Sequence, residues 1–162
     1  MKPWIINASP LILLGKINRL ELLGALPPSL SIPRAVSLEI LAGPDSDPAK
    51  IWTQNQGIPS IVPDSDIPPE IQAWDLGAGE TAVISLGVLR RNSICILDDL
   101  AARNCAEVFQ IPVIGTLGIL LKAKSAGLIP ELKPEMDRLV AVGSMLSGRI
   151  IQEALCLAGE SS

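Results

Sequence analysis

Histidine and tyrosine are both absent from this sequence of 162 residues, and aromatic residues make up only 2% of it. Without histidine, the chain has no Ser-His-Asp triad, no Cys-His dyad and no histidine-ligated zinc site. The scarcity of aromatic residues leaves the core to Leu, Ile, Val and Ala, and apolar residues together make up 48% of the chain. This aliphatic content argues against disorder and suits buried parallel strands.

Basic residues and cysteines are also few. The chain has 13 Lys and Arg against 17 Asp and Glu, which gives a formal net charge of -4. A broad basic surface for nonspecific DNA binding is therefore not expected. The negative net charge does not exclude RNA as a substrate, because a cation held by acidic residues attracts phosphate. Cys95, Cys105 and Cys156 are odd in number and lack C-x-x-C spacing, so we predict buried free thiols in a reducing cytosol.

Long hydrophobic runs are missing as well. The first residues are apolar after Lys2, but Asn7, Ser9 and Pro10 interrupt the run, and no small-residue cleavage site follows. No segment approaches the roughly 20 apolar residues that span a bilayer. The sequence therefore predicts a cytoplasmic protein without a membrane span.

Short aliphatic runs alternate with helical patterns along the chain. The runs predict strands at residues 4–7, 30–32, 61–62, 94–97 and 112–114. The helical patterns lie at residues 10–20 (with a break near Gly15 or Asn18), 33–41, 48–56, 80–91, 100–109, 116–124, 131–141 and 146–158. This alternation predicts an α/β fold, a three-layer αβα sandwich with a central parallel sheet. The length fits one domain over residues 1–162, with C-terminal helices near 131–158.

Several acidic residues stand where such a sheet binds ligands, which is outside the carboxyl ends of its strands. Asn7 ends the first strand, and Asp98 and Asp99 end a later one. Glu80 lies in the first turn of a helix, and we expect Glu39 to be partly buried because its neighbours are apolar. Each acid also has a structural explanation, such as a helix cap for Asp99 or a favourable helix dipole for Glu80.

Taken together, these acids indicate a metal site. Three or four carboxylates that converge on one pocket repel one another, and a bound cation relieves the repulsion. Ligands that offer only oxygen favour Mg²⁺ or Mn²⁺ over zinc. Such a metal polarises a phosphodiester and lowers the pKa of an attacking water.

Four segments resemble motifs of PIN-domain proteins. They are residues 5–12 (IINASPLI), 79–82 (GETA), 96–103 (ILDDLAAR) and 112–120 (PVIGTLGIL). Each segment alone is a weak signal, but their combined order is specific, and the resemblance covers most of residues 3 to 140. Within this family, the motifs resemble those of a prokaryotic branch of PIN-like proteins related to VapC-type toxins.

The resemblance implies a metal-dependent endoribonuclease that hydrolyses RNA phosphodiester bonds with Mg²⁺ or Mn²⁺. Its catalytic residues would be Glu39, Glu80 and Asp99, its metal ligands would also include Asn7 and Asp98, and Ser9 and Thr116 would be polar neighbours. Whether Asp98 or Asp99 is the main ligand stays open, because Asp99 suits the family spacing and Asp98 lies closer to the strand end. The resemblance also implies a toxin role, with RNA as substrate, an antitoxin protein as partner and a homodimer.

One position departs from the family pattern. PIN-domain proteins usually carry Asp where this chain has Asn7, and an amide offers a neutral carbonyl oxygen in place of a carboxylate. We therefore expect weaker metal binding. The alternative function is a catalytically weak or inactive PIN-like module that binds a protein or RNA partner.

Overall fold

Five short strands pair in parallel and form a central sheet in the order β3-β2-β1-β4-β5. The strands are β1 (Trp4–Ile6), β2 (Leu30–Pro33), β3 (Ile61–Val62), β4 (Ile94–Ile96) and β5 (Val113–Ile114). This architecture comes from a computed structural model of the chain, which describes residues 1–160. The central strand β1 pairs on both sides, so that Trp4 lies opposite Leu30 on one neighbour and Ile94 on the other.

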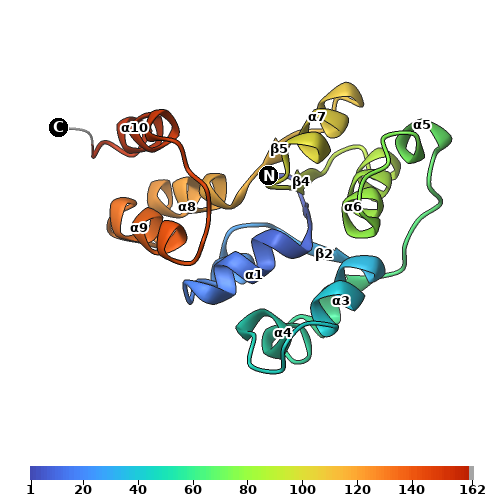
Figure 1. The fold of residues 1–162 in the computed structure, drawn as a ribbon, viewed down its shortest axis with the longest axis horizontal. Helices are drawn as coiled ribbons and strands as arrows, with labels where there is room; N and C mark the ends of the chain where they lie inside the picture. Colours follow the sequence, from blue (N-terminus) through green and yellow to red (C-terminus); the bar gives the residue numbers. More distant parts are fainter. Residues whose placement is uncertain (161–162) are drawn as a thin grey trace.

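Helices flank this sheet and complete the predicted three-layer sandwich. They are α1 (Ala8–Lys16), α2 (Leu22–Ala25), α3 (Arg34–Leu41), α4 (Pro48–Thr53), η1 (Ile58–Ser60), α5 (Pro69–Gln72), α6 (Ala78–Leu89), α7 (Leu100–Val108), α8 (Thr116–Ser125), α9 (Lys133–Ala141) and α10 (Gly148–Leu157). Figure 1 shows α1, α8 and α9 on one side of the sheet and α5 and α6 on the other.

The strands and the longer helices follow the sequence-based prediction closely. The predicted short strand at residues 61–62 is confirmed as the edge strand β3. Helix α1 begins at Ala8 rather than at Pro10, and it ends before Asn18, whose φ of 60° confirms the predicted break. Ser147 caps α10 as the sequence indicated, since its hydroxyl accepts a hydrogen bond from the backbone of Ile150.

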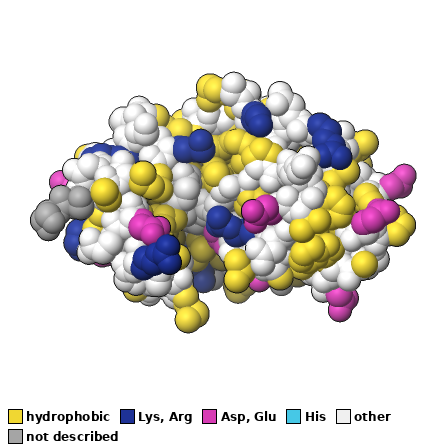
Figure 2. Space-filling model, turned by 90° about the horizontal axis from the view of Figure 1, so that it is seen from above, with side chains coloured by type: hydrophobic (Ala, Val, Ile, Leu, Met, Phe, Trp, Pro, Cys, Tyr) yellow, Lys and Arg dark blue, Asp and Glu magenta, His cyan; other side chains and the backbone are white. Residues whose placement is uncertain are grey.

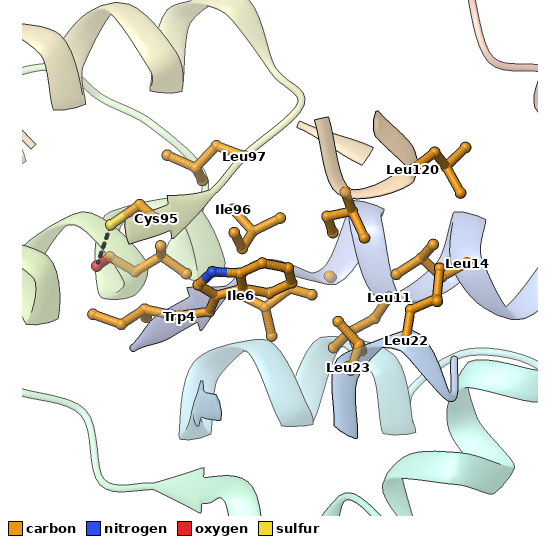
Figure 3. Packing of buried hydrophobic residues seen from close by; sticks show 14 of the residues in the cluster. Trp4, Ile6, Leu11, Leu14, Leu22, Leu23, Cys95, Ile96, Leu97 and Leu120 are labelled. Atoms are coloured by element: carbon orange, nitrogen blue, oxygen red, sulfur yellow. Dashed lines mark hydrogen bonds between the residues drawn. The ribbon is translucent and has the colours of Figure 1, made fainter. Parts of the chain in front are cut away.

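Aliphatic side chains from the sheet and the flanking helices make up the core (Figure 3). All three residues of β1 are buried, as are Leu11 and Leu14 on α1. Cys95 and Cys105 are buried free thiols, as predicted, and burial raises the pKa of Cys95 to about 12. The prediction that all three thiols are buried is wrong for Cys156, which is exposed because it lies on the outer side of α10.

The distance between α6 and β4 depends on Gly87. A Cβ atom there would lie 2.8 Å from the Sγ atom of Cys95. Gly87→Ala is therefore expected to lower the free energy of unfolding by about 1 kcal/mol net, since overpacking outweighs the gain in helix propensity. Urea unfolding of the single and double mutants would measure this, and the cost should shrink in a Cys95→Ala background. Gly24→Ala is the control, because within residues 1–160 no atom outside its chain neighbours and its own helix backbone lies within 4 Å of its added Cβ.

No helix within residues 1–160 is long and apolar enough to cross a membrane. Residues 161–162, which belong to the domain predicted over residues 1–162, lie outside the described part of the chain. The assignment of one domain stays a prediction.

Candidate functional site

The order of the strands defines where a ligand can bind. Strands β2 and β3 lie on one side of β1, and strands β4 and β5, which come later in the chain, lie on the other side. In open parallel sheets, the crevice for ligands lies at the carboxyl ends of strands where the order reverses, here between β1 and β4. Asn7 follows β1 at this point, and Asp98 and Asp99 follow β4. The backbone N–H of Asn7 donates to the carbonyl oxygen of Ile96 over 3.1 Å, which fixes the two strand ends side by side.

The side chain of Asn7 is buried but lacks a partner. Only 5% of the residue is exposed, and within residues 1–160 its Oδ1 atom accepts no hydrogen bond. A Cβ atom on Gly79, in the first turn of α6, would lie 3.0 Å from this Oδ1 and 3.3 Å from Oε1 of Glu39. Asn7 and Glu39 therefore face the same small space, which stays open because residue 79 has no side chain. A buried oxygen without a partner is costly, and a ligand in this space would satisfy it.

Glu39 differs from its prediction in one respect. We expected partial burial, but Glu39 is exposed. The buried face of α3 consists of Val36, Ser37 and Ile40, whereas Leu38 next to Glu39 is 53% exposed. Apolar neighbours in sequence are thus a poor guide here, because the helical repeat turns Leu38 and Glu39 away from the core.

Glu80 is half-buried at the third position of α6. Burial raises the pKa of Glu80, and the negative charges of Asp99 and Glu39 raise it further, although a hydrogen bond from the backbone of Gly77 opposes the rise. The three carboxylates therefore interact across the crevice. Among residues 1–160, however, no three Asp, Glu, Cys or His side chains gather closely enough to form a metal cage by themselves.

Asp98 and Asp99 make different contacts. Asp98 accepts hydrogen bonds on both oxygens: from the backbone and hydroxyl of Thr116, each at 2.7 Å, and from the hydroxyl of Ser9 at 3.3 Å. These bonds tie α1 and the start of α8 to the end of β4. Asp99 caps α7 through one oxygen, Oδ2, which accepts from the backbone of Ala102 at 3.0 Å. Its other oxygen has no hydrogen bond within the described chain, so Asp99 is the freer ligand.

A groove of about 700 Å³ begins at Asp98. Ser9 and Thr116 line it beside Asp98, and its far wall is formed by apolar side chains of α8, α9 and the segment that leads to α10. Arg103 lines the same groove, although the sequence did not single it out. The signal available was its position on α7, one helical turn after Asp99.

A family model for the PIN domain matches residues 3–160, so the chain belongs to the PIN-domain family. The predicted resemblance is thereby confirmed, and the fold is of a nuclease type whose members generally depend on divalent metals. No curated protein matches the chain. The roles predicted for individual site residues stay predictions.

Proposed function

We propose that this protein is a metal-dependent endoribonuclease that binds Mg²⁺ or Mn²⁺ between Asn7, Glu39, Glu80 and Asp99. The observation that carries the proposal is the buried Oδ1 atom of Asn7, which lacks a partner and faces the same space as Glu39. This space lies at the reversal of strand order, where a parallel α/β sheet binds its ligand.

The chemistry of these residues suits a hard cation. All four side chains offer oxygen, which Mg²⁺ and Mn²⁺ prefer. A cation would satisfy the amide oxygen of Asn7 and offset the repulsion that raises the pKa of Glu80. Because Asn7 is neutral, the set carries less negative charge than one with Asp at that position, and weaker affinity follows.

The residues divide into ligands and positioning groups. Glu39, Glu80 and Asp99 would hold the cation and orient the water, and Asn7 would add a neutral ligand. A bound metal would polarise the phosphodiester and lower the pKa of the attacking water. Asp98, whose oxygens are occupied by Ser9 and Thr116, positions the start of α8 beside the site. These contacts support Asp99 rather than Asp98 as the main ligand.

Calorimetry with Mn²⁺ tests the proposal. The native protein is expected to bind Mn²⁺ at roughly millimolar concentration or below, and Glu39→Ala and Asp99→Ala should each abolish binding. Glu131→Gln, which removes an exposed carboxylate outside the site, should bind as the native protein does. If the native protein takes up no Mn²⁺ at these concentrations, the nuclease proposal is wrong.

A second candidate function is a module that binds a protein or RNA partner without cleaving RNA. It is favoured by the neutral Asn7 and by the lack, within residues 1–160, of a preassembled cage of three acids. Cleavage of RNA by the native protein in Mn²⁺, lost in Asp99→Ala, would exclude it. Under the nuclease proposal, the wider partners are an RNA substrate in the cytoplasm and, for a toxin, an antitoxin protein and a second copy of the chain.

A further inference from the structure

Arg103 is a cation that lies beside the proposed site and, within residues 1–160, has no ion-pair partner. It lies on α7, and its Nη1 atom and the Oδ1 atom of Asp98 lie 2.9 Å and 2.8 Å from the place that a Cβ on Gly115 would occupy. Even so, Arg103 forms no ion pair with any carboxylate in residues 1–160, neither with Asp98 nor with Glu107 one turn further along α7. Its guanidinium is therefore available to a ligand in the groove.

The groove provides both surfaces that a nucleotide needs. The groove is lined by the guanidinium of Arg103, by Asp98 with the hydroxyls of Ser9 and Thr116 that donate to it, and by apolar side chains such as Leu121 and Leu146. Its volume of about 700 Å³ lies in the range of small-ligand pockets, roughly 300–1,000 Å³. No aromatic side chain lines the groove in the described chain, so a base would bind by apolar contact and not by stacking on a ring.

The position of the groove indicates which nucleotide it would take. Asp98, on its wall, is adjacent in sequence to Asp99, a proposed metal ligand. A single strand of RNA that places one phosphate at the metal would therefore reach the groove with its neighbouring nucleotide. Single-stranded RNA fits better than a duplex, because an unstacked base is free to leave the strand and enter a pocket.

Because the chain has few basic residues, a single cation beside the site is expected to affect its affinity for RNA. The formal net charge is -4, and Figure 2 shows Lys and Arg as separate groups on the face in view, without a broad basic patch. Most nucleic-acid binders gain affinity from many such contacts. We therefore expect the loss of one guanidinium beside the site to have a measurable effect on the affinity for RNA.

We infer that Arg103 and the groove form a subsite that binds the phosphate and base of the nucleotide next to the scissile bond in single-stranded RNA. The inference rests on the proposed nuclease function, which it extends by naming the form of the substrate and a residue that positions it. Arg103 is a positioning residue and not a metal ligand.

The test is fluorescence polarisation of a labelled oligouridylate of about ten nucleotides, titrated in EDTA so that no cleavage occurs. Arg103→Ala is expected to weaken binding about tenfold. It should also reduce the slope of log affinity against log salt by about 0.7, the value for one contact to a single strand. Arg103→Lys keeps the charge and should keep the slope. Ser144→Glu, which adds a negative charge to the groove wall, should weaken binding without touching Arg103.

Arg91→Ala is the matched control. Arg91 precedes β4 and so lies at the opposite end of the sheet, where it donates to the carbonyl oxygen of Phe109. RNA affinity in this variant should equal that of the native protein, and Mn²⁺ affinity should be the same in all the variants.

The outcomes separate this inference from the function on which it rests. If the native protein cleaves RNA in Mn²⁺ but Arg103→Ala binds the oligouridylate unchanged, the subsite is wrong and the nuclease proposal stands. If binding depends on Arg103 but no metal supports cleavage, the RNA subsite stands and the nuclease proposal fails. If the native protein does not bind the oligouridylate, the inference is overturned.

Discussion

RNA cleavage in Mn²⁺ is expected to fall by more than about 100-fold when Glu80 is replaced by glutamine. The amide keeps the shape of the side chain but loses the charge that holds the cation. The same change should stabilise the protein in EDTA, because Glu80 is partly buried and is repelled by Asp99 and Glu39. A residue that contributes to catalysis at a cost in stability is expected to show such opposite effects when it is replaced.

The raised pKa of Glu80 also predicts the direction in which stability changes with pH. Burial and the neighbouring carboxylates raise the pKa of Glu80 above its ordinary value of 4.5. A carboxyl group whose pKa rises on folding stabilises the folded state below its ordinary pKa, and this contribution is lost as the pH rises through the folded-state pKa. In EDTA, the native protein should therefore lose more stability than Glu80→Gln between mildly acidic and neutral pH, as measured by urea unfolding.

Glu131→Gln is the control for this prediction, because it removes the same charge from an exposed position. Its stability and cleavage rate should match those of the native protein at each pH. If Glu80→Gln cleaves RNA at the native rate, Glu80 is not part of the metal site.

The largest loss of stability is expected from Glu135→Ala. Glu135 is 2% exposed on α9, and its Oε1 atom accepts hydrogen bonds from Arg19, which follows α1, and from Arg138 at 3.0 Å. Removing the carboxylate leaves Arg19 partly buried without its main partner. The expected loss is about 3 kcal/mol, near the lower end of the range for a broken buried pair, because both arginines keep some contact with water.

Acid should weaken the contribution of Glu135. Burial raises the pKa of this carboxyl group, but the hydrogen bond and charge of Arg19, together with Arg138, outweigh burial and lower the pKa below 4.5. The stabilisation is therefore present above pH 4.5 and is lost as the pH falls through the folded-state pKa. The difference between the native protein and Glu135→Ala in urea unfolding should shrink accordingly.

Glu21→Ala provides the comparison, because Glu21 contacts the same arginine at 3.4 Å but is 61% exposed. An exposed ion pair contributes little, and a change below about 1 kcal/mol is expected. Equal losses in Glu21→Ala and Glu135→Ala would contradict a structural role for the buried carboxylate.

The sheet could be predicted from the sequence because its strands are short aliphatic runs separated by strongly periodic helices. The one-turn helices α2 and α5 could not. A helix of four residues has almost no intrinsic stability, so packing decides whether it forms. In α5, for example, Ile71 is completely buried, and nothing in the surrounding Pro-rich sequence indicates this.

The site could be predicted only as far as topology determines it. The alternation of strands and helices is enough to place Asn7 and Asp98 at the same edge of the sheet. The separate roles of Asp98 and Asp99 depend on Ser9 and Thr116, which are distant in sequence and reach Asp98 only after folding. The position of Arg103 beside Gly115 depends likewise on how α7 packs against the start of α8.

The central place of β1 has a consequence for synthesis on the ribosome. β1 is made before β4, and the register of the sheet joins Ile6 to Ile96. At roughly 5–20 residues per second, Ile6 is without this neighbour for a time on the order of 5–20 s. During that interval, the nascent chain carries an apolar strand with one unpaired edge in the middle of its future sheet. Association between neighbouring nascent chains therefore competes with folding until β4 has been made.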